Sequence, residues 1–233
     1  MARPRFVVGV GNPGPEYAGT RHNAGFEILD LLAGRLAVSW RSETSGGLRA
    51  EGTTTDAPFV LLKPGTFVNR TGSACRRLRD EFGDAFEPSR LLVVVDDMAL
   101  PPGRLRLREG GSAGGHNCLW SVIDGLQTME FPRLRAGIGG VPAAAWREHV
   151  LAPPSAEEKP SLDRAYARAA EIALGFLNGI PLAALAVNAN RALPREPGPA
   201  TGGDGSGGAC RPVPPDRGAR RDSSSLGGDT KSE

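Results

Sequence analysis

The chain has 233 residues, of which 39% are hydrophobic and 23% charged, a profile typical of a globular protein that buries a core without disulfide support. Its formal net charge is only +2, so charge by itself neither requires nor excludes a nucleic-acid partner. The cysteines are widely spaced and no stretch approaches the roughly 20 apolar residues of a membrane span, so we expect a cytoplasmic protein with no disulfide framework and no membrane anchor.

Strand-like and helix-like patterns alternate over residues 1–193. The predicted elements, in chain order, are strand Phe6–Val10, helix Ala24–Leu36, strand Phe59–Leu62, helix Gly72–Phe82, strand Leu91–Val95, strand Leu105–Leu107, helix Cys118–Leu126, strand Leu134–Ile138 and helix Ala165–Asn178. Asn117 is expected to cap the helix that follows it, and Gly179 to close the last helix. Strands separated by helices predict a three-layer α/β domain.

The composition changes at Pro194. From there to Glu233, 20 of 40 residues are Gly, Pro or Ser, and bulky aliphatic side chains are rare. Such a segment cannot bury enough apolar surface to offset the entropy lost on ordering. We therefore expect one domain over residues 1–193 and a disordered Gly/Pro/Ser-rich tail over residues 194–233.

Polar residues stand in turns that directly follow predicted strands, where open α/β sheets bind ligands. His22 lies in the first such turn and is a candidate general base, although it or Asn23 could also cap the next helix. Asp96 and Asp97 follow a wholly apolar strand, where they could partner a histidine, bind a metal, or form a cap or turn.

Two further segments carry candidate binding groups. Glycines at residues 110–115 precede a predicted helix, so their backbone N–H groups could hold a phosphate or an oxyanion, but the lysine of a P-loop is missing. Asn69 could orient a water molecule or read a substrate amide, or could cap a helix. The three histidines lack metal-ligand spacing and no GxSxG motif occurs, so direct activation of water, without a metal, fits better than a covalent nucleophile.

Taken together, these segments resemble the bacterial peptidyl-tRNA hydrolase family over roughly residues 5–191. The matching pieces occur in the order and at about the spacing of the family: Val8–Gly14, Glu16-Tyr17, Thr20–Gly25, Lys63–Asn69, Asp96–Met98, Leu100–Gly103, Gly114–Asn117 and Leu134–Gly139. This resemblance implies a single α/β domain with a mixed, twisted sheet flanked by helices. It also implies hydrolysis of the ester between a peptide and the 3′-terminal ribose of tRNA. We expect a monomer that works without metal or cofactor.

The resemblance assigns roles to individual positions. It makes His22 the catalytic base and Asp96 the carboxylate that orients it. It implies that substrate contacts come from one further group of residues: Asn12, Tyr17, Phe67, Asn69, Gly114, His116 and Asn117. Contacts with tRNA phosphate are implied for Arg135, and Arg147 is the candidate replacement for a lysine that the family often carries after the position of Gly139.

The chain departs from the family pattern in that lysine and at two other positions. Ala99 stands where the family usually has a second aspartate, and Val68 stands where it has methionine. Two other readings remain open on sequence alone: an RNA-binding module without activity, and a metal-dependent peptidase or nucleotidase. The first predicts loss of His22 or Asp96, and the second predicts a metal-binding cluster and inhibition by a chelator.

Overall fold

A mixed seven-stranded sheet forms the centre of the computed structural model, which describes residues 2–191. The strands are β1 (Arg5–Gly9), β2 (Arg41–Ser42), β3 (Leu48–Thr53), β4 (Pro58–Lys63), β5 (Leu91–Asp97), β6 (Leu105–Arg108) and β7 (Arg133–Gly137). Their order in the sheet is β2-β3-β4-β1-β5-β7-β6. The central strands β4, β1, β5 and β7 are parallel, and the outer strands pair antiparallel.

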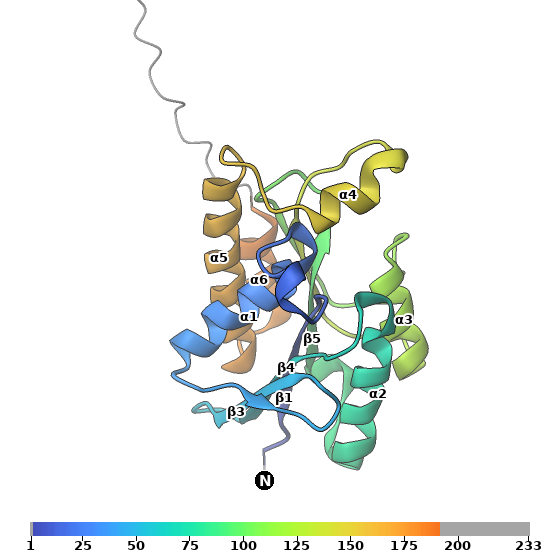
Figure 1. Ribbon diagram of the computed structural model, residues 1–233. Coiled ribbons are helices and arrows are strands. Elements are labelled where there is room, and N and C mark those ends of the chain that lie inside the picture. Colours follow the sequence, from blue (N-terminus) through green and yellow to red (C-terminus); the bar gives the residue numbers. More distant parts are fainter. Residues whose placement is uncertain (1, 192–233) are drawn as a thin grey trace, which may run out of the picture. The chain divides into compact units, whose positions relative to one another are not determined.

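Helices cover both faces of the sheet (Figure 1). They are α1 (Ala24–Arg35), α2 (Thr71–Phe82), α3 (Asn117–Leu126), α4 (Trp146–Leu151), α5 (Lys159–Leu177) and α6 (Leu182–Asn190). One core cluster joins the sheet to α1, α5 and α6, and a second joins it to α2 and α3. Because β5 is buried along its whole length, its apolar run from Leu91 to Val95 fits a central strand that is covered on both sides.

Two glycines allow close packing, one of helix α1 against the sheet and the other of helix α2 against helix α3. A Cβ on Gly25, in the first turn of α1, would lie 2.6 Å from the carbonyl oxygen of Val94 in β5. A Cβ on Gly72, in α2, would collide with the backbone of Ser121 in α3, and the Gly72 N–H donates to the Ser121 hydroxyl at 3.0 Å. These contacts fix α1 against the sheet and α2 against α3, at the edge of the molecule where the candidate site lies.

The predicted α/β class and mixed sheet are confirmed, and each predicted helix and strand overlaps an observed one. Asn117 does not cap α3: it is the first residue of the helix, and the extended residue before it is His116. α5 begins at Lys159, whereas the predicted helix began at Ala165. The prediction missed the first turns because they are polar and lack an apolar period. The pattern missed β2, β3, α4 and α6, whose sequences are short or lack clear alternation.

Nothing between residues 2 and 191 forms a helix long and apolar enough to cross a membrane. The Gly/Pro/Ser-rich tail predicted for residues 194–233 lies outside the described residues.

Candidate active site

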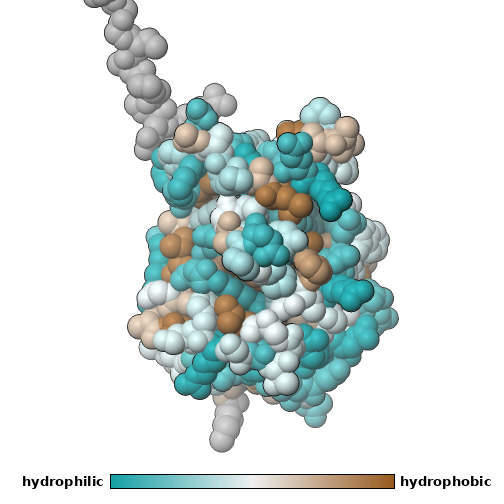
Figure 2. Space-filling view, in the orientation of Figure 1, coloured by the Kyte–Doolittle hydropathy of each residue, from teal (hydrophilic) through white to brown (hydrophobic). Residues whose placement is uncertain are grey.

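A cleft of about 370 Å³ opens at the carboxyl ends of the central strands. Its walls come from segments far apart in the sequence: His22, Val68, Asn69, Asp96, Met98, Gly115, His116, Asn117, Cys118, Trp146, Arg147 and Val150. Crossover connections bring these segments together, because parallel strands place their following loops at the same edge of the sheet. In Figure 2, apolar side chains gather beneath α4 in the middle of the visible face.

His22 and Asp96 form the only directly paired acid and base among the described residues that line this cleft. The Nδ1 atom of His22 lies 3.0 Å from both carboxylate oxygens of Asp96. Asp96 is the sixth residue of β5 and is 2% exposed, whereas His22 lies in a 3-10 turn before α1 and is half-buried. When Nδ1–H donates to the carboxylate, Nε2 is the ring atom left to accept a proton.

The electrostatics of the pair favour a charged Asp96 beside a basic His22. Burial by itself would lower the pKa of His22, but the hydrogen bond and the negative charge of Asp96 outweigh it and raise that pKa. Burial would raise the pKa of Asp96, but the hydrogen bond from His22 and the nearby imidazoles of His22 and His116 hold that pKa well below its usual range. Asp96 is therefore an ionised acceptor at neutral pH.

His116 approaches the same carboxylate from the loop before α3. Its Nε2 lies 3.8 Å from Asp96 Oδ1, too far for a direct hydrogen bond. Its Nδ1 is buried and has no hydrogen-bond partner among the described residues. The structure thus brings three residues singled out from the sequence, His22, Asp96 and His116, around one buried charge.

Asp97 has a different structural role from Asp96. Its Oδ1 accepts the backbone N–H of Ala99 at 2.9 Å, which is the turn role considered from the sequence. Its Oδ2 lies 3.2 Å from the Arg135 guanidinium, which also donates to the carbonyl of Ala113 at 2.8 Å. Arg135 is largely buried and is not among the residues that line the cleft, so its guanidinium ties β5 to the glycine-rich loop. Its contact with tRNA phosphate stays a prediction.

The asparagines divide into two pairs. Asn12 and Asn23 bind each other: the Asn12 backbone N–H donates to Asn23 Oδ1 at 2.8 Å, and Asn23 Nδ2 donates to the Asn12 carbonyl at 3.0 Å. Asn12 Oδ1 accepts the Val68 N–H at 3.1 Å, which joins the first turn to the segment that carries Asn69. Asn69 and Asn117 line the cleft itself.

The alternative reading of some polar residues as helix caps is wrong. His22 lies inside the 3-10 turn, and Asn23 occupies the cap position of α1 but makes no side-chain cap bond, because its amide is used by Asn12. Asn69 also lies inside a 3-10 turn, so Arg70 occupies the cap position of α2. The polar side chains are therefore not explained by the local needs of the helices.

Tyr17, Phe67 and Gly114 lie beside the cleft without lining it. The rings of Tyr17 and Phe67 meet edge to face with centroids 6.2 Å apart, and Phe67 is 52% exposed. Gly114 has a φ of +59° and a Cβ there would meet the Arg135 guanidinium at 3.2 Å. The glycine therefore lets the loop bend over Arg135 on its way to His116.

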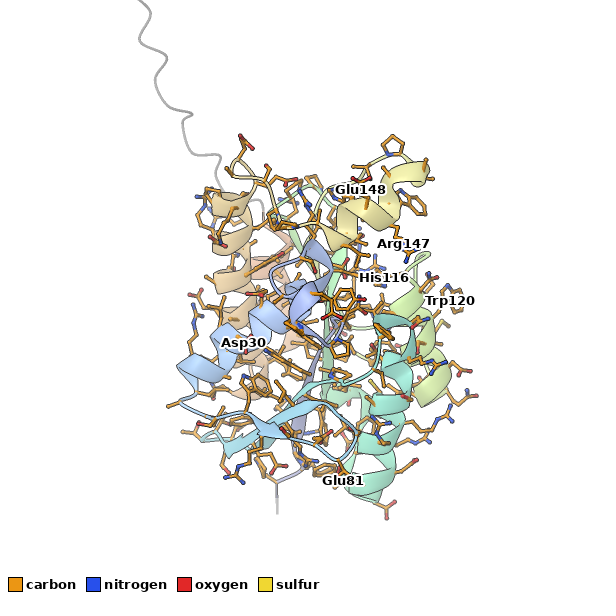
Figure 3. The ribbon with its side chains drawn as sticks, in the orientation of Figure 1. Asp30, Glu81, His116, Trp120, Arg147 and Glu148 are labelled. Atoms are coloured by element: carbon orange, nitrogen blue, oxygen red, sulfur yellow. The ribbon has the colours of Figure 1, made fainter. Side chains whose placement is uncertain are left out.

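Sequence reasoning missed Met98, Trp146 and Val150, which supply apolar parts of the cleft wall. Trp146 and Val150 belong to α4, a helix too short to give a periodic signal. Figure 3 shows Arg147 extending from α4 towards the loop before α3, where His116 lies. The predicted Arg147 thus reaches the cleft through an element that the sequence pattern did not reveal.

A buried ion pair fastens α4 and the following segment to the turn that carries His22. Arg21, 7% exposed, forms this pair with Glu158 and donates to the carbonyls of His149 and Ala152. The backbone N–H of Arg21 also donates to Ala152 at 3.1 Å. Because Arg21 and His22 are adjacent, these bonds help to fix the position of the imidazole relative to α4.

Within residues 2–191, no cluster of three or more His, Cys, Asp or Glu side chains has the arrangement of a metal site.

Comparison with known proteins gives one family. The family model described as Peptidyl-tRNA hydrolase matches residues 6–194. A peptidyl-tRNA hydrolase of Synechococcus sp. (strain CC9605) is 51% identical over 164 residues, covering 67% of this chain and 78% of that protein. One from Halalkalibacterium halodurans is 41% identical over 173 residues, covering 74% of this chain and 92% of that protein.

Solved structures agree with the sequence relatives. The crystal structure of peptidyl-tRNA hydrolase from Acinetobacter baumannii superposes with a TM-score of 0.75 at 30% identity, covering 82% of this chain and 96% of that one. A peptidyl-tRNA hydrolase in complex with N-propanol gives a TM-score of 0.77 at 29% identity, covering 84% of this chain and 98% of that one. Because the family model matches residues 6–194 and both of these sequence relatives are more than 40% identical, this chain belongs to the peptidyl-tRNA hydrolase family.

Proposed function

We propose that this protein hydrolyses the ester bond of peptidyl-tRNA and so returns free tRNA to translation, with water activated by His22 and Asp96. Membership of the family supports the substrate and the reaction. The observation that carries the mechanism is the contact between His22 Nδ1 and the buried Asp96 carboxylate at 3.0 Å, in a cleft of about 370 Å³.

The chemistry follows from the roles of the two ring nitrogens. Nε2 of His22 takes a proton from a water molecule as the water oxygen attacks the ester carbonyl. Asp96 holds the tautomer with the proton on Nδ1 and stabilises the imidazolium that forms. When the tetrahedral intermediate collapses, its bond to the ribose 3′-oxygen breaks, and the imidazolium returns the proton to that oxygen. The products are the peptide acid and tRNA with a free 3′-hydroxyl.

The asparagines supply amide groups around this centre. Asn117 lines the cleft, so its amide is the first candidate to donate to the developing oxyanion. Asn12 is not among the cleft-lining residues; its Oδ1 accepts the Val68 N–H, so its Nδ2 is the second candidate donor. Asn69, exposed in the cleft wall, suits the peptide backbone, which is common to all peptides. Tyr17, Phe67, Gly114 and His116 complete the proposed substrate-binding surface.

The tRNA backbone is proposed to bind through its phosphates to positively charged side chains at the mouth of the cleft. Arg147 is exposed and lines the cleft, so it is the first candidate for a phosphate contact. We further propose that the enzyme works in the cytoplasm as a monomer without a cofactor. Binding should weaken as salt rises, because each phosphate contact releases counterions.

The direct experiment is release of an N-acetylaminoacyl group from tRNA by wild type and His22→Ala, in EDTA. We expect hydrolysis by the wild type and a loss of roughly 100-fold or more in the variant, the range for a general base. Circular dichroism of both proteins controls for folding. Activity that EDTA abolishes and zinc restores would contradict the proposed mechanism, and salt-sensitive tRNA binding without hydrolysis would identify a binding module instead.

A further inference from the structure

Trp146 is a large aromatic side chain that the fold does not use in its core. It is 50% exposed, and neither core cluster of the described residues includes it. Its indole Nε1–H donates to the Val141 carbonyl at 2.8 Å, so the ring is held in place and its one polar group is satisfied. By contrast, Trp40 is half-buried and packs against the core. An indole that is fixed, exposed and already hydrogen-bonded offers only its flat face to a ligand.

The position of Trp146 places that face at the reaction cleft. Trp146 and Arg147 begin α4, and both line the cleft that contains His22. Arg147 makes no hydrogen bond or ion pair with any described residue, so its charge is available to a ligand. Of the described cleft-lining residues, Asp96 alone carries a carboxylate, and that carboxylate is almost fully buried and bonded to His22. A flat aromatic beside an unpaired cation matches a nucleotide, which has a base and a phosphate.

We propose that Trp146 is the stacking platform for the terminal adenine base of the tRNA substrate, with Arg147 facing an adjoining phosphate. The inference rests on the proposed function and extends it by naming the residue that recognises the nucleoside side of the ester. The base is the constant part of the substrate, because every tRNA ends in adenosine, whereas the peptide side chain varies. A rigid aromatic wall suits the constant partner, and stacking requires no further hydrogen bonds from the indole.

The test compares two small esters of the same N-acetylated amino acid. One is the 3′-ester of adenosine 5′-monophosphate, and the other is the corresponding ester of a 1-O-methylribose 5-phosphate, which has no base. For the adenosine ester we expect Trp146→Ala to raise KM about tenfold with kcat little changed, and Trp146→Phe to recover part of the loss. For the ester without a base, KM should be the same in wild type and Trp146→Ala.

Trp120→Ala is the matched control, because Trp120 is 55% exposed on α3 but does not line the cleft. It should behave as wild type with both esters. An equal loss with both esters in Trp146→Ala would mean that Trp146 supports α4 or contacts the peptide, and would overturn the proposal.

A second measurement does not depend on turnover. Adenosine 5′-monophosphate should quench the indole fluorescence of wild type and of Trp120→Ala, and the quenching should disappear in Trp146→Phe. Equal quenching of wild type and Trp146→Phe would refute base stacking on Trp146 even in an active enzyme. Quenching that requires Trp146, in a protein that does not hydrolyse N-acetylaminoacyl-tRNA, would retain the nucleotide site and reject the proposed hydrolase function.

Discussion

Replacing Asp96 with asparagine removes the charge beside His22 while keeping the size of the side chain. Both carboxylate oxygens lie 3.0 Å from Nδ1, and Asp96 is almost fully buried, so water cannot replace the lost interaction easily. The asparagine NH2 group can also face Nδ1 and select the opposite tautomer, which places the proton on the nitrogen that must act as base. We therefore expect both the rate and its pH dependence to change.

A hydrogen bond to a charged group contributes about 1.5–3 kcal/mol, which corresponds to roughly a 10- to 150-fold fall in kcat before any effect of the tautomer. The sign of the pH effect follows from the base form. Neutral His22 is active, and its pKa is raised above the ordinary 6.5, so wild-type kcat/KM falls as pH drops through that raised value. In Asp96→Asn the charge that raises the pKa of His22 is gone, and burial, which lowers that pKa, remains. The acidic limb of the pH profile should therefore move to lower pH.

The assay is kcat/KM for N-acetylaminoacyl-tRNA between about pH 5 and 9, a range that spans the titration of histidine. Asp97→Asn is the matched control, since Asp97 contacts Arg135 and Ala99 and not His22, and its acidic limb should keep the wild-type midpoint. A lowered plateau with an unmoved midpoint in Asp96→Asn would refute the assignment of the limb to His22. An unchanged plateau would refute the orienting role of Asp96.

The remaining predictions concern stability. Gly25→Ala should lower the free energy of unfolding by about 3 kcal/mol, because the added Cβ meets strand backbone that cannot move aside, including the Val94 carbonyl at 2.6 Å. Gly34→Ala, in the same helix with open space around its Cβ position, should instead raise it by about 0.5–1 kcal/mol; urea denaturation measures both, and equal effects would contradict the packing argument. Glu158→Gln should lower it by about 1.5–3 kcal/mol, because it removes the negative charge that is paired with the buried Arg21, and should also lower kcat; full activity would show that this anchor does not position the site.

Much of the fold could be predicted because its central elements carry strong local signals. The apolar run at Leu91–Val95 and the helical spacing at Ala24–Leu36 reflect burial that each segment meets in any α/β fold. The elements that were missed depend on neighbours. β3 alternates only weakly because it lies near the edge of the sheet, and α4 is stabilised by contacts with Arg21 rather than by its own sequence.

The candidate site divides in the same way. The sequence by itself made His22, Asp96, Asp97 and Asn69 candidates, because polar residues after apolar strands are costly unless they are used. The family resemblance added Asn12 and Asn117 and favoured Asp96 over Asp97. The residue pattern alone could not separate Asp96 from Asp97: their side chains point to opposite faces of the strand, and the pattern does not say on which face the histidine lies. Only the tertiary structure decided that Asp96 faces His22, that Asp97 binds Arg135, and that α4 brings Trp146 over the cleft. Those contacts join residues far apart in the chain, and their geometry is set by the packing of helices on the sheet, which no local pattern encodes.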